Sequence, residues 1–364
     1  MLCFKKNFCL YILFFFTSLV FISCDTVHTK NENNKTNNLD CQIPTNKLID
    51  SGVGRGGIPA LTNPPLVHHR SENTDYLADS SRVIGLLFGE RALAIPHNIL
   101  WHHEIVNIDN WGGSTISVTY CPLTGSSIAF SRSAINKAEL GVSGLLFNNN
   151  LVMYDRRKNE SLWPQMNRKA GCGPAIGNSL KMLPVIEMRW EHWRTLHPET
   201  KIVSSHTGYA RNYRPDGYPY GNYEQLRNER LLFKGTPVDN RRPPKERVLG
   251  IPVGGAGGIA LPFGALRNAS PVRVVKVPVA GRKVTVFWNR EARSAMAFNT
   301  TNSFSVVDGN IVDDATGSVW TVEGRAVDGP REGEQLKPIN KAYVAFWFAW
   351  AAFQPATALW TSSS

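Results

Sequence analysis

A pattern of residues that occurs twice constrains the fold of this chain more than any other feature. The segment 83–86 (Val-Ile-Gly-Leu) reappears at 248–251 (Val-Leu-Gly-Ile), and 161–163 (Ser-Leu-Trp) reappears at 318–320 (Ser-Val-Trp). Later in each copy come two tryptophans, a proline and a threonine: Trp190, Trp193, Pro198 and Thr200, then Trp347, Trp350, Pro355 and Thr357. Because the matches keep their order, we infer a tandem duplication.

Each copy has the residue pattern of a mainly β module. Alternating β-branched and aromatic residues, bounded by Gly, Pro, Asn and Asp, predict short strands. These strands are expected at 82–88, 116–120, 127–131 and 151–154, with 284–288 and 295–299 in the second copy. Helices are expected at 190–197 and 347–354, each ending before a proline. The predicted fold class is mainly β (α+β with few short helices). The paired tryptophans are interpreted as packing anchors.

The N-terminus has the features of an export signal. Lys5 and Lys6 precede an apolar run at 8–22 that ends at Ser23 and Cys24. The run is short for a transmembrane span, and a small residue before a cysteine is typical of a lipoprotein cleavage site. We expect residues 1–23 to be a signal peptide with a lipobox-like end and Cys24 to receive the lipid. An uncleaved anchor or plain secretory cleavage is the alternative. In each case we expect the rest of the chain to be exported, and the lipid would hold it at a bacterial membrane, on the periplasmic side or at the cell surface.

The remaining chain divides by composition. A polar, Asn-rich segment at 24–50 predicts a flexible tether. The first module is assigned to 51–210 and a second, degenerate module to 248–364. Between them, the segment 211–247, called the connector below, has nine Lys or Arg, five Asp or Glu and four Tyr. Such a segment suits either a surface that binds sugars or anions or a long connection packed across two domains, and we favour the packed connection.

Charge and cysteine content narrow the partners. The formal net charge is +11, and loss of Lys5 and Lys6 with the signal leaves +9. A basic surface attracts nucleic acid or anionic polymers, but an exported, tethered protein does not meet nucleic acid, so we predict none and keep an anionic or glycan ligand. After removal of the signal and lipidation, three cysteines remain: Cys41, Cys121 and Cys172. Either Cys121–Cys172 or Cys41–Cys172 can pair, which leaves one thiol unpaired or liganding.

Chemically capable residues that occur in one copy only are the candidates for function. His102 and His103 stand opposite Asn268 and Ala269 of the second copy, and Cys121 stands opposite Asn289. The candidate site therefore belongs to the first module.

Several motifs around these residues are similar to the uncharacterised, exported DUF3179 family. The motifs are His-Glu-Ile-Val-Asn at 103–107, Tyr-Cys-Pro-Leu-x-Gly at 120–125, Gly-Val-Ser-Gly-Leu-Leu at 141–146, Met-Tyr-Asp-Arg at 153–156, Gly-Ile-Pro-Ala-Leu at 57–61 and Ser-Leu-Trp-x-Gln at 161–165. The resemblance implies a family of unknown function and no particular reaction. Many relatives have a second cysteine in a Cys-Pro-Leu-Cys-Gly motif. Here Thr124 stands at that position, which argues against a dithiol redox centre.

The preferred hypothesis for the site is transition-metal binding. Imidazole and thiolate together suit copper or zinc, so Cys121, His103 and His102 are the predicted ligands, with His97 as a further nitrogen donor.

Two alternatives stay open. In a Cys-dependent acyl-transfer or hydrolytic enzyme, His103 would deprotonate Cys121, and Glu104 or Asp155 would orient the imidazole. In a binding lipoprotein without chemistry, the cleft between the copies and the connector would hold a glycan or a partner protein. The sequence decides neither the substrate nor the oligomeric state.

Overall fold

The computed structural model describes residues 40–268 and 270–362. The predicted signal peptide and the predicted lipid site at Cys24 lie outside these residues. Among the helices that are described, none combines the length and the apolar composition needed to cross a membrane.

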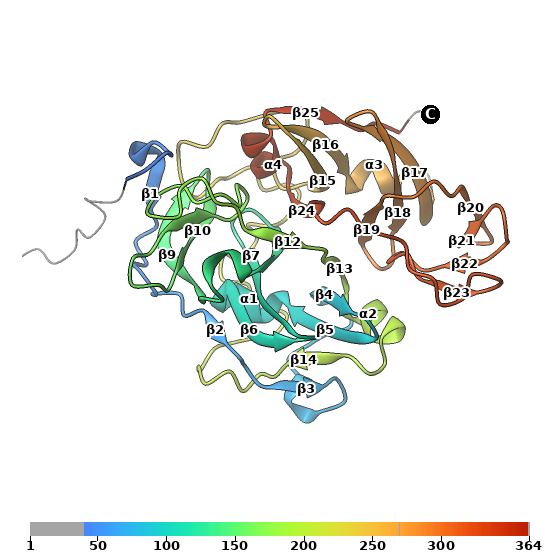
Figure 1. Ribbon diagram of the computed structural model, residues 1–364, viewed down its shortest axis with the longest axis horizontal. Coiled ribbons are helices and arrows are strands. Elements are labelled where there is room, and N and C mark those ends of the chain that lie inside the picture. Colours follow the sequence, from blue (N-terminus) through green and yellow to red (C-terminus); the bar gives the residue numbers. More distant parts are fainter. Residues whose placement is uncertain (1–39, 269, 363–364) are drawn as a thin grey trace, which may run out of the picture. The chain divides into compact units, whose positions relative to one another are not determined.

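The first half of the fold contains three sheets, two short α-helices and three 3-10 turns (Figure 1). The first sheet has the order β13 (Ile186–Arg189), β4 (Arg82–Phe88), β5 (Arg91–Pro96), β14 (Lys201–Val203) and β3 (Leu66–His68). The second has β12 (Lys181–Leu183), β8 (Ser126–Ser131), β7 (Ser114–Cys121), β6 (Ile105–Trp111) and β2 (Leu61–Thr62). The third has β1 (Leu48–Asp50), β9 (Leu140–Phe147), β10 (Asn150–Asp155) and β11 (Leu162–Pro164). The helices are α1 (His97–His103) and α2 (Trp190–Leu196), and the 3-10 turns are η1 (Thr45–Lys47), η2 (Glu72–Thr74) and η3 (Ser133–Ile135).

The second half also contains three sheets. The first has the order β24 (Tyr343–Phe346), β15 (Arg247–Gly254), β16 (Gly257–Pro262) and β25 (Ala356–Leu359). The second has β17 (Val272–Val279), β18 (Arg282–Asn289) and β19 (Ser294–Phe298), and the third has β20 (Phe304–Val307), β21 (Asn310–Asp313), β22 (Val319–Trp320) and β23 (Ala326–Asp328). Two helices, α3 (Phe263–Arg267) and α4 (Trp347–Phe353), accompany them. The predicted mainly β class is confirmed.

The two halves pair their strands in the same way. In the first half β13 is antiparallel to β4, β4 is antiparallel to β5, and β5 is parallel to β14. In the second half β24, β15, β16 and β25 repeat this series of antiparallel, antiparallel and parallel pairs. The shared pattern agrees with the repeated sequence motifs. The duplication itself stays an interpretation.

The repeated glycine and tryptophan of the sequence pack against each other. A Cβ atom at Gly85 would lie 2.0 Å from the Trp193 ring, and one at Gly250 would lie 2.2 Å from the Trp350 ring. In both halves the indole Nε1 donates to the threonine seven positions later over 2.9 Å. Only a glycine lets each strand approach its tryptophan this closely, which explains why the pair occurs in both copies.

Most predicted elements are present. The strand β4 has the predicted bounds, and α2 and α4 each end one residue before the predicted end, because His197 and Gln354 have left the helical conformation. The helix α1 was not predicted. Its seven residues are too few for a clear periodic pattern.

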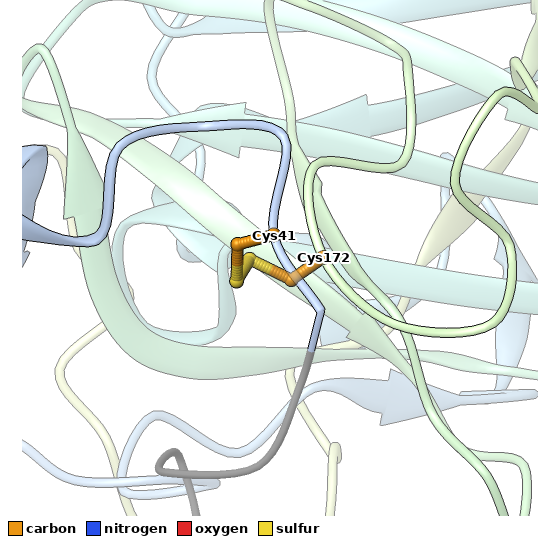
Figure 2. The surroundings of a disulfide bond; sticks show 2 residues. All are labelled: Cys41 and Cys172. Atoms are coloured by element: carbon orange, nitrogen blue, oxygen red, sulfur yellow. A yellow bond between two sulfur atoms is a disulfide. The ribbon is translucent and has the colours of Figure 1, made fainter.

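A disulfide ties the start of the described chain to the first half. Cys41 and Cys172 are bonded (Figure 2), which selects one of the two pairings that the sequence allowed. Cys121 is a free thiol. Residues 41–50, assigned above to the end of the tether, are therefore part of the fold, since β1 also pairs with β9.

The two halves share hydrophobic cores. One cluster joins Trp193 and Ile202 of the first half to Phe287, Phe298 and Trp320 of the second. A second cluster joins the surroundings of Cys121 to the buried residues of α4. The halves have separate sheets but are not separate hydrophobic units.

Candidate functional site

Cys121 is fully buried at the end of β7. The backbone N–H of Leu151 points at its sulfur over 3.4 Å, and the sulfur lies 3.8 Å from the carbonyl oxygen of Asn149. Burial raises the pKa of the Cys121 thiol to about 12, and the carboxyl of Glu104 adds to the shift. A thiol in such surroundings stays protonated at neutral pH and is a poor nucleophile.

The loop after Cys121 is the place where the connector and the second half attach. Its three carbonyl groups accept hydrogen bonds from outside the first half. The pairs are Tyr218 Oη to Pro122 O (3.1 Å), Tyr223 Oη to Leu123 O (3.0 Å) and Phe346 N to Thr124 O (2.8 Å). The Cys-Pro-Leu-Thr-Gly motif is thus used for packing between the parts of the fold.

Thr124 occupies the position of the second cysteine of many relatives. Its hydroxyl is buried and pairs with the Ser126 hydroxyl over 2.9 Å, and Asn150 donates to it over 3.0 Å. Gln165 completes this group through Ser126 and Asn150. The replacement leaves no unbonded polar group, so the motif keeps its structural role without a second thiol.

His102 and His103 lie on α1, and their ring nitrogens contact the connector. His103 is buried, with Nδ1 2.7 Å from the Pro59 carbonyl oxygen and Nε2 2.6 Å from the Tyr213 hydroxyl. His102 Nε2 is 2.8 Å from the Asn212 carbonyl oxygen. Burial lowers the pKa of His103 to about 4, so its imidazole is neutral at pH 7.

Glu104 ends α1 in an unusual conformation. Its φ of 56° lies in the left-handed region, which is typical of glycine at this position of a helix. The side chain is buried, and it has no hydrogen bond to any residue in 40–268 or 270–362. Burial raises its pKa to about 8, and its charge acts on Cys121 and on Tyr220 of the connector. Perturbed acids of this kind are candidates for function.

Asp155 has a structural environment. Its carboxylate accepts the indole N–H of Trp163 over 2.8 Å and the backbone N–H of Ser161 over 3.2 Å, and it forms an ion pair with Arg157. Trp163 and Ser161 belong to the signature motif at 161–165. Asp155 therefore orients Trp163 rather than a histidine.

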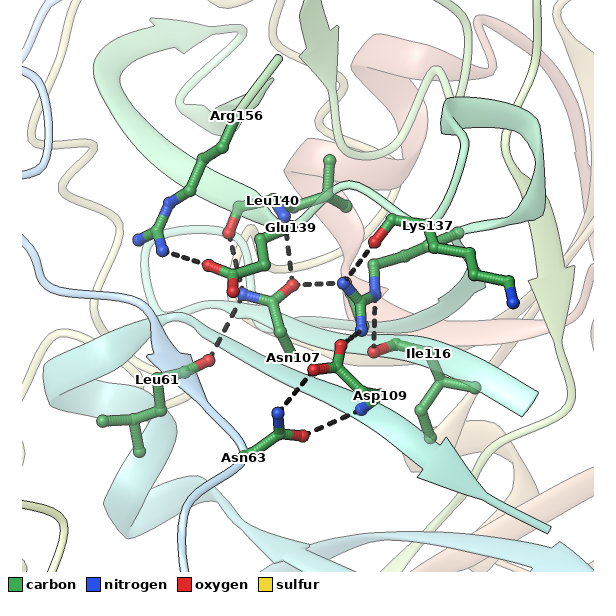
Figure 3. Close-up of polar contacts among 11 residues, drawn as sticks. Leu61, Asn63, Asn107, Asp109, Ile116, Lys137, Glu139, Leu140 and Arg156 are labelled. Atoms are coloured by element: carbon green, nitrogen blue, oxygen red, sulfur yellow. Dashed lines mark hydrogen bonds and ion pairs between the residues drawn. The ribbon is translucent and has the colours of Figure 1, made fainter. Parts of the chain in front are cut away.

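Asn107, the last residue of the His-Glu-Ile-Val-Asn motif, joins three strands (Figure 3). Its amide donates to the carbonyls of Leu61 in β2 and Leu140 in β9, and its oxygen accepts from the N–H of Leu140. Nearby, the buried guanidinium of Arg132 pairs with Asp109. This motif also satisfies buried polar groups inside the first half.

The predicted ligands and catalytic residues are not brought together as a set. Within the described chain, no group of three His, Cys, Asp or Glu is placed to hold a metal ion. No hydrogen bond joins Cys121 to His103, or His103 to Glu104 or Asp155, in the same part of the chain. The metal site and the Cys/His pair stay predictions.

A buried ionic network that the sequence did not indicate lies between the halves. Glu187 in β13 accepts from Arg82 (2.7 Å), Arg247 (3.3 Å) and Ser127 (2.5 Å). His97 Nε2 is 3.8 Å from the same carboxylate, and burial lowers the pKa of His97 to about 3. Burial opposes ionisation of Glu187, but the nearby cations outweigh it and hold its pKa below the ordinary value. Because Arg82 lies in β4 of the first half and Arg247 in β15 of the second, the network holds the two halves together at Glu187.

An open cleft lies between α2 and the β4–β5 turn of the first half and the sheet β20–β23 of the second. Three cavities of about 350, 360 and 330 Å³ adjoin there, because they share lining residues. The first two share Leu196, Thr321 and Val327, and the first and third share Leu87, Gly89, Glu90, Glu323 and Arg325. Each volume is in the range of small-molecule sites.

Two polar groups at the cleft have no bonding partner in the described residues. The Nε1 of Trp320 and the Nδ1 of His192 are buried, make no hydrogen bond and belong to side chains that line the cavity of about 360 Å³. Trp320 as a whole is 3% exposed. Beside them, His197 Nε2 and the buried Glu323 carboxylate are 2.8 Å apart. The indole Nε1 atoms of Trp101, Trp111 and Trp288 are buried and unbonded among the described residues in the same way, and Trp320 differs from them in lining this cavity.

The cleft is acidic although the whole chain is basic. Four carboxylates line it, and one guanidinium, that of Arg325, accompanies them. The carboxylates belong to Glu90, Glu191, Glu199 and Glu323. Such a lining disfavours an anionic ligand.

This cleft was not predicted from the sequence, although the search for chemically capable residues that occur in one copy only could have found part of it. His192 and His197 stand opposite Ala349 and Gln354 in the second copy, so they are also chemically capable residues that occur once. Trp320 was hidden, because it matches Trp163 and both were interpreted as packing anchors.

Comparison with known proteins places the chain in a family but gives no function. No curated protein and no solved structure matches it. A family model with the description "Protein of unknown function (DUF3179)" matches residues 55–357, which include both halves and the connector. The resemblance seen in the motifs is thereby confirmed, and the chain belongs to the DUF3179 family.

Proposed function

We propose that this protein is an exported, lipid-anchored binding protein that holds a neutral glycan in the cleft between its halves. The observation that carries the proposal is the buried indole N–H of Trp320, which lines a cavity of about 360 Å³ and has no acceptor among the described residues. A ligand oxygen in that cavity would satisfy it.

The lining of the cleft suits hydroxyl groups. Carboxylates accept hydrogen bonds from hydroxyls, and the side chains of Asn289, Asn310 and Thr321 can donate and accept. Apolar side chains such as Ile311 and Leu196 offer contact to the carbon face of a sugar ring. The excess of carboxylates argues against an anionic polymer at this place.

The sequence and the disulfide support export. The apolar run before Cys24 predicts a lipid anchor, and the Cys41–Cys172 disulfide is of a kind that persists in oxidising compartments. A tethered protein of this type would meet glycans of the cell envelope.

The test is calorimetric titration of the full chain, purified in a non-ionic detergent, with chitotetraose and with maltotetraose. We expect the wild type to bind at least one of these neutral oligosaccharides. Trp320→Phe removes one hydrogen bond to the ligand, which corresponds to a loss of affinity of roughly fivefold or more.

Trp163→Phe is the matched control, because its indole N–H is already bonded to Asp155. It should leave affinity unchanged. The proposal would be refuted if the wild type bound neither sugar, or if Trp163→Phe and Trp320→Phe lost the same affinity.

Metal binding and thiol chemistry, the other functions predicted from the sequence, both require Cys121. The glycan proposal predicts that Cys121→Ser binds the sugar as tightly as the wild type. Copper or zinc measured in the wild type and absent from Cys121→Ser would instead favour the metal site.

A further inference from the structure

Arg189, Arg267 and Arg293 come close to one another at the turn between β18 and β19. Arg189 donates its backbone N–H to the carbonyl of Ala292 over 2.9 Å, which holds the end of β13 against this turn. Arg290 donates to the carbonyl of Arg267 over 2.6 Å, which holds the end of α3 against the same turn. Arg293 is part of the turn, with a φ of 50°. Segments that are far apart in sequence therefore present Arg189, Arg267 and Arg293 together.

These three side chains differ from the two arginines behind them. Arg82 and Arg247 are bonded to the carboxylates of Glu187 and Glu224. By contrast, the guanidinium groups of Arg189, Arg267 and Arg293 form no ion pair with any residue that the structure describes. The Nε of Arg189 is buried and has no hydrogen bond there.

Positive charges gathered without a counterion repel one another. Burial lowers the pKa of Arg293, and the charges of Arg189, Arg247 and Arg267 lower it further, while Glu224 acts in the opposite direction. Glu291, exposed in the same turn, forms no ion pair with the three arginines in the described part of the fold. An anion that joined these guanidinium groups would be attracted by all three of them.

We propose that Arg189, Arg267 and Arg293 form a binding site for a phosphate group. A guanidinium has a planar fork of donors that matches two oxygens of a phosphate, so clusters of arginine suit this group better than isolated cations do. This site goes beyond the proposed glycan site and differs from it in charge, because the cleft is lined mainly by carboxylates. A soluble phosphate ester and a phospholipid headgroup both carry the required chemistry.

The experiment compares wild type, Arg189→Gln and Arg293→Gln as full chains in non-ionic detergent at constant ionic strength. Each is titrated calorimetrically with inorganic phosphate and with glycerophosphoglycerol, the headgroup of phosphatidylglycerol without its acyl chains. Loss of one charge-assisted contact should weaken binding by roughly tenfold or more in either variant. Tighter binding of phosphate would indicate a soluble ligand, and tighter binding of glycerophosphoglycerol a headgroup.

Arg282→Gln is the matched control, because it removes the same charge from an exposed position at the far end of β18. It should change affinity by less than roughly twofold. Without phosphate, Arg293→Gln should melt at the same or a higher temperature than the wild type, because repulsion is relieved, and added phosphate should raise the melting temperature of the wild type more than that of Arg293→Gln. The proposal is overturned if neither probe binds the wild type, or if Arg282→Gln loses as much affinity as Arg293→Gln.

Discussion

In the first half, Trp163 donates its indole N–H to the carboxylate of Asp155 over 2.8 Å, whereas the corresponding Trp320 and Asp313 of the second half are not bonded. Asp313 Oδ2 has no hydrogen bond in the described chain and lies 3.7 Å from Arg331 Nε. The same two residue types thus form a closed pair in one half and an open pair in the other.

The backbone around the two pairs is nevertheless alike. Asp155 N donates to the carbonyl of Ser161 over 3.2 Å, and Asp313 N donates to the carbonyl of Ser318 over 2.9 Å. The two aspartates are thus held by the same backbone hydrogen bond, although the loop from aspartate to serine is one residue shorter in the second half. In the second half, Trp320 lines a cavity and its indole N–H has no acceptor among the described residues, although the strands are paired in the same way.

The largest expected effect tests what the halves share. Trp193→Ala and Trp350→Ala each remove a fully buried indole that packs on a strand glycine. Each should lower the free energy of unfolding by about 3–5 kcal/mol, because a large cavity is left behind. Urea unfolding of the full chain, followed by circular dichroism, measures the two losses. If the halves use this packing equally, the two values should agree within about 1 kcal/mol, since both sites lose the same atoms and the same indole-to-threonine bond.

The shared scaffold was largely predictable from the sequence. A run of β-branched and aromatic residues marks β18, and Pro198 and Pro355 mark the ends of α2 and α4. Such signals are local, because strand alternation and proline stops depend on neighbours in the chain. The helix α1 was missed because its apolar residues, Ile99 to Trp101, are consecutive and give no period, and because no proline follows it as one follows α2 and α4.

The site was less predictable, since it depends on contacts between distant segments. Whether Cys172 pairs with Cys41 or Cys121 depends on which strand ends meet, and the sequence leaves both open. His103 was singled out in the sequence, but its partners could not be: Pro59 lies near the start of the first module and Tyr213 lies in the connector. The missing acceptor of Trp320 is invisible in sequence, because its candidate, Asp313, is present.

A smaller effect would sharpen the comparison through pH. Glu104 is a buried acid of the first half, and Ser270 stands at the aligned position of the second. In the fold its pKa is about 8, above the ordinary value of 4.5, so the folded state binds an extra proton between these pH values. Stability therefore falls as the pH rises from about 4.5 to 8. Glu104→Gln should remove this fall and be more stable than the wild type at pH 8, with no difference at pH 4.

Glu187→Gln is a control of opposite sign. The pKa of Glu187 is held below 4.5 by its cations, so its contribution to stability is present above pH 4.5 and is lost as the pH falls through its folded pKa. Melting temperatures of the three proteins between pH 2 and pH 9 give the comparison, because the folded pKa of Glu187 is about 2. A constant difference between wild type and Glu104→Gln across this range would show that Glu104 is ionised in the fold.

The smallest effect addresses the open and closed pairs directly. Trp163→Phe and Trp320→Phe remove the same atoms from buried positions, so the packing cost should be similar in both. Trp163→Phe additionally deprives the buried Asp155 carboxylate of a donor, which costs about 1–3 kcal/mol more. Trp320→Phe removes an indole N–H that has no acceptor, and this part of the change should be neutral or slightly stabilising in the absence of ligand. Urea midpoints measured without sugar separate the variants. If both lose the same free energy, Trp320 has a partner in solution, and the released donor would no longer support a ligand in the cleft.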